Sequence, residues 1–159
     1  MAYAAHKDID AGLIPVIDIG PLRDGSDPAS VAQAIFEASR DVGFLYVSNH
    51  GIPEDLITRA HDSGLAFFRQ TEDDKLSVAI NRDHRGFLRQ GGAKMDDDAR
   101  ADLKESFIWG HDFPDHLRGK PLHGTNQWPE SMPSLQPLLE EYFSAAHGVA
   151  HHIMRACAL

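Results

Sequence analysis

The segment after Asp27 repeats apolar residues at helical spacing, at Val31, Ile35, Ala38 and Val42. Positions three or four apart fall on one face of an α-helix. Asp27 is a residue type that caps helices, and Pro28 suits the first helical turn. Gly43 is typical of a helix end. The pattern therefore predicts a helix that begins at Pro28 and ends before Gly43.

Shorter apolar runs on either side of this helix predict strands. The run 13–19 is β-branched and bounded by glycine, with Pro15 at its start or on an edge. The run 44–47 is aromatic and branched, which favours a buried strand, and Asn49-His50-Gly51 then turns the chain. Further along, Phe87-Leu88 and the tract 104–110 also predict strands.

A second helix is predicted after Pro53, with one apolar stripe formed by Leu56, Ile57, Ala60, Phe67 and Phe68. Thr71 is followed by three acids, so a short third helix carrying Leu76 is expected there. The tract 81–102 is polar and predicts a long loop, while 113–133 is proline-rich and predicts extended coil.

The final segment, 134–159, has the most regular pattern. Its apolar face comprises Leu135, Leu138, Leu139, Tyr142, Phe143, Ala146, Val149, Ala150, Ile153 and Cys157. The pattern predicts a long helix, and no Gly, Asn or Pro marks its far end. Two interpretations follow: a terminal helix that frays at Leu159, or a helix that continues into residues beyond it.

Charge and cysteine content narrow the classes of function. Fifteen Lys and Arg stand against 24 Asp and Glu, a formal net charge of -9, and a field of this sign repels nucleic acid and anionic membranes. The single cysteine cannot form an internal disulfide, and the first residues lack the apolar run of a signal peptide. We expect a cytoplasmic protein, with residues 1–159 forming one domain.

The histidines offer few metal-ligand spacings. The His-x-Asp triplet at His6-Lys7-Asp8 lies in a terminal segment without apolar support, whereas an iron site needs a stiff scaffold. His147 and His151 are four apart on the last helix, with His152 adjacent, but the sequence places no third ligand. No nucleophile elbow or phosphate loop occurs. From the residues alone, we predict neither a catalytic residue nor a metal ligand in this chain.

Several tracts, taken in order, resemble the amino-terminal region of the isopenicillin N synthase-like and 2-oxoglutarate–Fe(II) dioxygenases. The most specific are 42–52 (Val-Gly-Phe-Leu-Tyr-Val-Ser-Asn-His-Gly-Ile) and 124–129 (Gly-Thr-Asn-Gln-Trp-Pro). They are joined by 14–18, by Phe67-Phe68 ahead of Glu72-Asp73-Asp74-Lys75, by Arg85-Gly86-Phe87 and by 102–107. The resemblance covers nearly the whole chain.

The resemblance implies an α+β fold in which helices and a few strands form the amino-terminal part of a jelly-roll (double-stranded β-helix) oxygenase, with the last helix as support. In that family the second half binds Fe(II) through a His-x-Asp and a later His, and an Arg-x-Ser holds the carboxylate of the co-substrate, usually 2-oxoglutarate. The resemblance leaves open a reaction without a co-substrate, like that of isopenicillin N synthase. This sequence has no Arg-x-Ser, and its one His-x-Asp is at the wrong end. The hypothesis is thus that the chain is the amino-terminal portion of an enzyme that oxidises a small organic molecule. We expect residues 1–159 alone to bind Fe(II) weakly and to be inactive.

The resemblance also indicates a substrate contact. Isopenicillin N synthase has an arginine two places before the glycine of a Gly-aromatic pair that binds a substrate carboxylate. Here His84 holds that place and Arg85 directly precedes Gly86, so Arg85, with His84 and Phe87, is the candidate substrate-binding set. The alternative is a surface arginine paired with an acid such as Asp83 or Asp96.

Two other hypotheses do not require catalysis. The chain could be a stand-alone interaction domain that meets a partner through its apolar helix and sheet edge, or, more remotely, a metal-binding protein built around His147 and His151. If the last helix lacks its covering layer, Tyr142 and Phe143 should be exposed and the chain should self-associate through that face.

Overall fold

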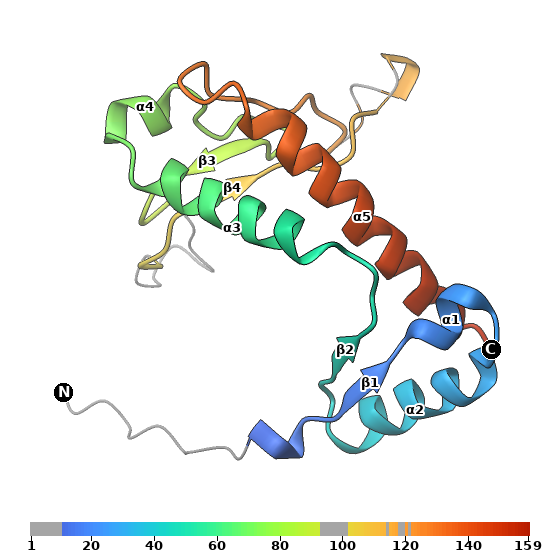
Figure 1. Ribbon diagram of the computed structural model, residues 1–159. Helices are drawn as coiled ribbons and strands as arrows, with labels where there is room; N and C mark the ends of the chain where they lie inside the picture. The colour runs from blue at the N-terminus through green and yellow to red at the C-terminus, as the bar shows by residue number, and fades with distance from the viewer. Residues whose placement is uncertain (1–10, 93–101, 114, 118–119, 121) are drawn as a thin grey trace. The chain divides into compact units, whose positions relative to one another are not determined.

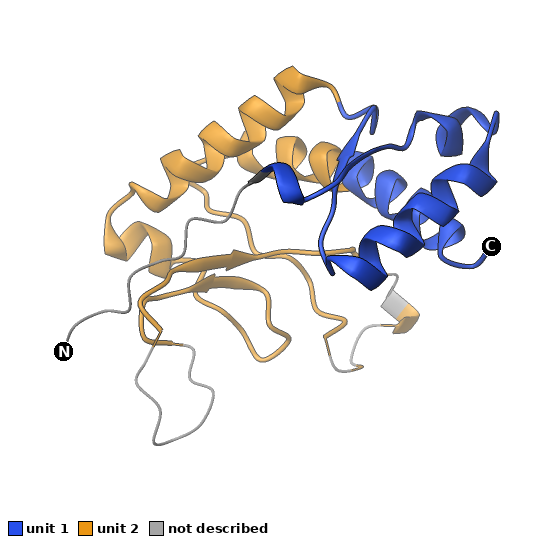
Figure 2. Ribbon diagram, turned by 90° about the horizontal axis from the view of Figure 1, so that it is seen from below, with its two compact units in different colours: residues 1–52, 144–159 blue, residues 53–143 orange. Residues whose placement is uncertain are grey.

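The computed structural model describes residues 11–92, 102–113, 115–117, 120 and 122–159. The helices are α1 (Gly20–Asp24), α2 (Pro28–Asp41), α3 (Glu54–Phe68), α4 (Glu72–Leu76) and α5 (Leu135–Ala156), with 3-10 turns η1 (Ala11–Leu13) and η2 (Asp115–Leu117). The strands are β1 (Val16–Asp18), β2 (Tyr46–Ser48), β3 (Gly86–Leu88) and β4 (Ser106–Ile108). Figure 1 shows their course. The chain forms two compact units, unit 1 (1–52 and 144–159) and unit 2 (53–143), coloured separately in Figure 2.

Unit 1 contains a parallel pair of strands joined by a helical connection. β1 pairs with β2 in the register Ile17 to Val47, and α1 and α2 lie between them in the chain. Parallel neighbours require such a crossover. The buried core of this unit is aliphatic and comprises Ile17, Ile19, Val31, Ile35, Ala38 and Ala156.

The prediction for α2 is confirmed at both ends. The Asp27 side chain accepts a hydrogen bond from the Ser30 amide at 3.1 Å, which satisfies one of the free N–H groups of the first turn. Val31, Ile35 and Ala38 are buried, as their spacing predicted. After the helix, Gly43 adopts φ +82°, a conformation that suits glycine best.

The strand predicted at 44–47 is shifted and is not buried. β2 covers 46–48, and Phe44 and Tyr46 are 74% and 57% exposed. Val16, the register partner of Tyr46, is 65% exposed. The reason is that unit 1 buries only one side of the strand pair, through Ile17, so the other side has no covering layer among the described residues of this unit.

Unit 2 surrounds an aromatic core. α3, the first half of α5 and the antiparallel pair β3–β4 supply it, with Phe87 opposite Phe107 in the register. The buried members are Ala60, Phe67, Val78, Phe87, Leu135 and Leu139. Phe67 contacts the rings of Phe68, Phe87 and Phe107 with centroid distances of 5.4, 5.9 and 4.7 Å.

The short helix α4 forms where it was predicted, but a different side chain is buried. Thr71 caps it by accepting a hydrogen bond from the Asp74 amide at 3.2 Å. Leu76 is 37% exposed, whereas Lys75 is only 6% exposed. A cationic side chain therefore occupies the inward position of this helix.

The long final helix is confirmed, but the expected exposure of its aromatic residues is wrong. Tyr142 and Phe143 are both half-buried, and Tyr142 packs against the aromatic core of unit 2. Farther along, Val149 and Ile153 pack against the aliphatic core of unit 1. The apolar stripe of α5 is thus largely used by the chain itself, while Met154 and Leu159 remain exposed.

Candidate functional site

The loop before β3 is shaped by Asn81. Its side-chain oxygen accepts hydrogen bonds from the backbone amides of Asp83 (2.9 Å) and Arg85 (3.1 Å). Its backbone amide donates to the Arg85 carbonyl at 2.9 Å. His84 takes a positive φ of 57° at the tip. Side-chain bonds of this kind are why asparagine favours turns. They fix the backbone from which Arg85 projects.

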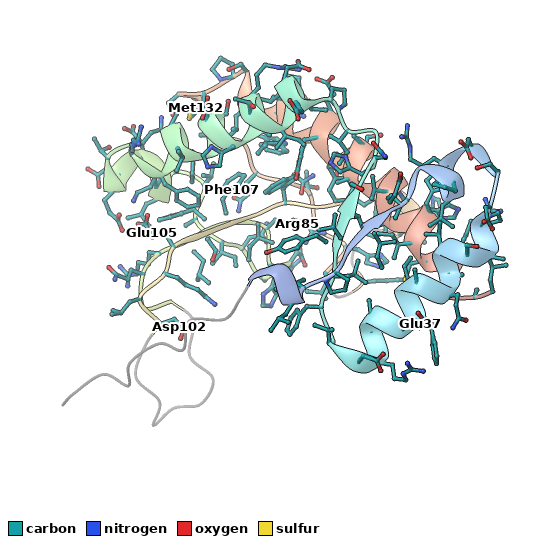
Figure 3. The ribbon with its side chains drawn as sticks, turned by 60° about the horizontal axis from the view of Figure 1, so that its bottom comes forward. Glu37, Arg85, Asp102, Glu105, Phe107 and Met132 are labelled. Atoms are coloured by element: carbon teal, nitrogen blue, oxygen red, sulfur yellow. The ribbon has the colours of Figure 1, made fainter. Side chains whose placement is uncertain are left out.

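The guanidinium of Arg85 rests against the backbone of neighbouring loops. Nη2 donates to the Leu122 carbonyl at 3.0 Å, and Nη1 lies 3.5 Å from the His84 carbonyl. A Cβ placed on Gly110 would be 3.1 Å from Nη2, so a larger residue there would require the guanidinium to shift by a few tenths of an ångström. The Nε atom is buried and has no hydrogen-bond partner. The side chain (labelled in Figure 3) is held, yet it keeps unused donor capacity.

Two side chains from the tract 124–129 clamp the same region. The Asn126 amide group donates to the Gly110 carbonyl at 2.8 Å and accepts from the Gly110 amide at 3.0 Å. Gln127 donates to the carbonyls of Ala79 (2.8 Å) and Arg85 (2.6 Å). These two positioning residues were not among the predicted site residues. Their presence in one of the most specific sequence tracts was the available signal.

Gly86 is required by internal packing. It has φ +113°, and a Cβ there would run into the Val78 carbonyl and the Gln127 side chain. A glycine allows a close approach to the backbone, by a ligand or by another part of the protein. The structure shows that the Val78 carbonyl and the Gln127 side chain already make the close approach to Gly86.

No carboxylate pairs with Arg85 among the described residues. The alternative ion pair with Asp83 is not formed; the Asp83 side chain instead lies against Gly124. Asp96, the other acid considered, lies outside the described residues. An arginine without a local counter-charge can still form two parallel hydrogen bonds to a ligand carboxylate.

The other two predicted site residues have different surroundings. His84 is exposed beside Arg85. Phe87 is 1% exposed and belongs to the aromatic core. The structure brings Arg85 and His84 together on one loop, and their role as substrate contacts stays a prediction, as does that of Phe87.

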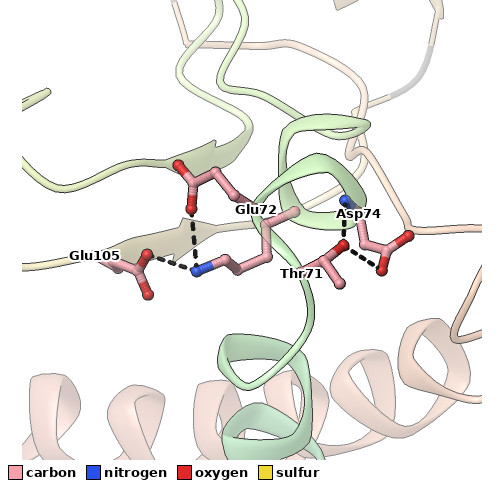
Figure 4. Close-up of polar contacts among 5 residues, drawn as sticks. Thr71, Glu72, Asp74 and Glu105 are labelled. Carbon is pink, nitrogen blue, oxygen red and sulfur yellow. Dashed lines mark hydrogen bonds and ion pairs between the residues drawn. The ribbon is translucent and has the colours of Figure 1, made fainter.

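Lys75 anchors α4 to β4 and to the Phe87 ring. Its ammonium donates to Glu105 at 2.6 Å and lies 3.4 Å from Glu72, as Figure 4 shows. It is also 5.1 Å from the centre of the Phe87 ring, a cation–π distance. The hydrogen bond to Glu105 raises the pKa of Lys75, and burial opposes that rise. The lysine therefore stays charged at neutral pH, although it is buried.

The described residues do not fit an iron site. They contain no group of three or more His, Cys, Asp or Glu side chains close enough to hold a metal ion. His147, His151 and His152 gather no such set in the part of the chain that is described, and His6 and Asp8 lie outside it. Nor does any described helix have the length and apolar character needed to cross a membrane.

Comparisons with known proteins extend this picture. Residues 14–131 match the family described as non-haem dioxygenase in morphine synthesis, N-terminal. Homoarginine-6-hydroxylase of Arabidopsis thaliana is 33% identical over 162 residues, which covers 92% of this chain and 44% of the relative. Isopenicillin N synthase of Amycolatopsis lactamdurans is 32% identical over 158 residues, covering 92% and 47%.

Solved structures show the same fold. A 2OG-Fe(II) oxygenase family protein from Caulobacter crescentus matches 92% of this chain and 48% of its own, with a TM-score of 0.77 and 24% identity. A full-length Neurospora crassa protein, solved in complex with alpha-KG, matches 94% and 48%, with a TM-score of 0.74 and 26% identity.

Fold and sequence together place the chain as an amino-terminal region in the 2-oxoglutarate–Fe(II) oxygenase family. More particularly, the chain belongs to the family of non-haem dioxygenase N-terminal domains. It spans about half the length of the curated relatives it matches.

Proposed function

We propose that this chain is the amino-terminal portion of an oxidoreductase that uses Fe(II) and 2-oxoglutarate to oxidise a small organic molecule. The observation that carries the proposal is the family match over 14–131, together with a fold likeness over 92% of the chain to one half of an oxygenase. When bound, iron and 2-oxoglutarate supply the oxidising chemistry. Since the described residues do not fit an iron site, the ligands would come from elsewhere in the complete protein.

The exposed face of unit 1 supports the proposal that a further layer of structure covers it in the complete protein. Val16 and Tyr46 are register partners, and both point away from the core of their unit. Parallel strands are normally covered on both faces, and two strands alone are marginal in water. We propose that a jelly roll in the complete protein covers this face and that α5 is its support helix.

Within that enzyme, we assign Arg85 to the substrate. No carboxylate neutralises it among the described residues, its Nη1 has only a 3.5 Å contact with the His84 carbonyl, and hydrogen bonds from Asn81 and Gln127 fix its backbone. This arrangement suits a substrate that carries a carboxylate. His84 would lie beside the bound group. Phe87 would support the strand from the core.

The test compares two arginines in the complete protein. Arg85→Ala should raise the Michaelis constant for an acidic substrate about tenfold or more, the equivalent of losing a charge-assisted hydrogen bond of about 1.5–3 kcal/mol. Succinate release without substrate should stay nearly unchanged. Arg82→Ala, which alters an exposed arginine of the same loop, is the matched control. Equal kinetics for the two variants would remove Arg85 from the substrate site.

A stand-alone interaction domain is the second candidate, and the exposed face at Val16 and Tyr46 is the observation that favours it. Reading the gene beyond the codon for Leu159 separates the two proposals. An in-frame continuation with His-x-Asp, a later His and Arg-x-Ser supports the oxygenase. An immediate stop codon supports the interaction domain.

A further inference from the structure

Unit 2 contains an apolar pocket that the proposed substrate site does not use. The pocket has a volume of about 180 Å³ and lies among α3, the β4 segment and α5. Its aromatic wall is made by Phe67, Phe68, Phe107 and Trp109. None of the residues around Arg85 that form the clamp, such as Asn126 and Gln127, belongs to its lining.

The wall of this pocket is wholly apolar. Leu135 and Leu139 of α5 complete it, and no polar atom is exposed on its surface. A water molecule inside such a space would meet no exposed polar atom of the wall, so it would make fewer hydrogen bonds than in bulk solvent. Atoms that face an empty space also lose dispersion contacts. The pocket therefore favours an apolar occupant over water.

One wall is open because of a glycine in the middle of a helix. Gly64 lies inside α3, and a Cβ built on it would meet nothing within 4 Å. A glycine here lowers helix propensity without relieving any crowding. Gly64, Phe68 and Trp109 are half-buried, so solvent and small molecules can reach the pocket, whereas Phe67 and Leu135 form its buried floor.

We propose that this pocket is a binding site for a monocyclic aromatic or similarly small apolar molecule. An apolar cavity of about 150 Å³ is large enough for benzene, so the volume here accommodates a single ring. Four aromatic side chains offer edge-to-face and offset contacts to that ring. No charged side chain lines the pocket, so ionic ligands are disfavoured.

The experiment uses benzene as the probe, with the thermal midpoint and NMR as readouts. At a benzene concentration ten times the dissociation constant, Tm should rise by about 3–5 °C. Phenol should bind about tenfold more weakly, because its hydroxyl would lose water without gaining a partner. Gly64→Leu should fill the space and abolish the benzene shift. Gly148→Leu, at a glycine of α5 that also has nothing within 4 Å, should leave it intact.

The two tryptophans supply a measurement that needs no variant. Trp109 lines the pocket and Trp128 does not, although both adjoin the aromatic core. Benzene should therefore shift the indole N–H resonance of Trp109 until the pocket is saturated. The resonance of Trp128 should remain nearly unchanged. Equal shifts at both indoles, no rise in Tm, or an unchanged response in folded Gly64→Leu would each overturn the proposal.

Discussion

Unit 1 and unit 2 differ in how completely each covers its own apolar side chains. The aliphatic core of unit 1 leaves Leu13, Val16, Phe44 and Tyr46 more than half exposed. Unit 2 gathers four phenylalanines and both tryptophans into one cluster, where Phe67 and Phe87 are 1% exposed. The difference teaches that unit 2 buries most of its large aromatic side chains within itself, whereas unit 1 presents an apolar surface typical of an interface.

The two units are alike in how their loops are held. In unit 2, side chains distant in sequence bind backbone groups, as Gln127 does at Ala79 and Asn126 at Gly110. In unit 1, long-range side-chain hydrogen bonds join Arg23 to the Asn49 carbonyl and Asn49 to Asp18. Long-range side-chain hydrogen bonds therefore position loops in both units, as a binding site requires.

The largest expected effect comes from removing an aromatic residue at the centre of unit 2. Phe67→Ala should lower the free energy of unfolding by about 4 kcal/mol, because it leaves a cavity among three other rings. Ile35→Val in the core of unit 1 should cost only about 1 kcal/mol. Denaturant unfolding followed by tryptophan fluorescence reports on unit 2, which contains Trp109 and Trp128. A loss below about 2 kcal/mol for Phe67→Ala would contradict the central, fully buried place of this ring in unit 2.

An intermediate effect is expected at the buried lysine. Lys75→Met should destabilise the protein by about 2 kcal/mol, because Glu105 loses its partner while remaining partly solvated. Lys104→Met, at an exposed lysine paired with Asp102, should change stability by less than about 0.5 kcal/mol. Chemical denaturation at neutral pH measures both.

The same lysine gives a pH dependence with a defined sign. Its pKa is raised above 10.5 in the folded protein, so its contribution is fully present below that value and is lost as pH rises through the higher folded pKa. Wild-type stability should thus fall more steeply than that of Lys75→Met in strongly alkaline buffer. Parallel curves would show that the Glu105 contact contributes nothing.

The smallest effect concerns one helix cap in each unit. Thr71→Ala should cost about 1 kcal/mol at neutral pH and keep part of that cost in acid, because the hydroxyl that accepts from the Asp74 amide does not titrate, although it also donates to the Asp74 carboxylate at 2.6 Å. Asp27→Ala should also destabilise, but only above the acid range. The hydrogen bond from Ser30 lowers the pKa of Asp27, so its contribution is present above the unfolded value of 3.8 and is lost as pH falls through the folded pKa. Thermal melts across this range distinguish the two caps.

Local chemistry made α2, α3, α4 and α5 predictable from sequence, whereas α1 was not predicted. Asp27, Thr71 and Pro53 mark helix starts through bonds to the first turn or through fixed backbone angles, and the stripe of α3 is read directly from its spacing. The strands were placed less accurately. Each has only three residues, so its bounds depend on a distant partner.

Long-range pairing explains what the sequence did not reveal. The burial of Lys75 requires Glu105, which lies 30 positions away, and nothing in the acidic tract around Lys75 indicates that partner. Arg85 was found by resemblance, but its contacts with Leu122 and Gly110 could not be anticipated. The predicted exposure of Tyr142 and Phe143 failed because the core that receives α5 comes from segments distant in sequence.

The bonds between Asn126 and Gly110 have one further consequence, for edge protection. Gly110 follows β4, and its amide and carbonyl are both occupied by a side chain instead of a neighbouring strand. A foreign strand that tried to extend the sheet at this position would have to displace two hydrogen bonds. Asn126 therefore opposes edge-to-edge aggregation at this position, which natural sheets must avoid.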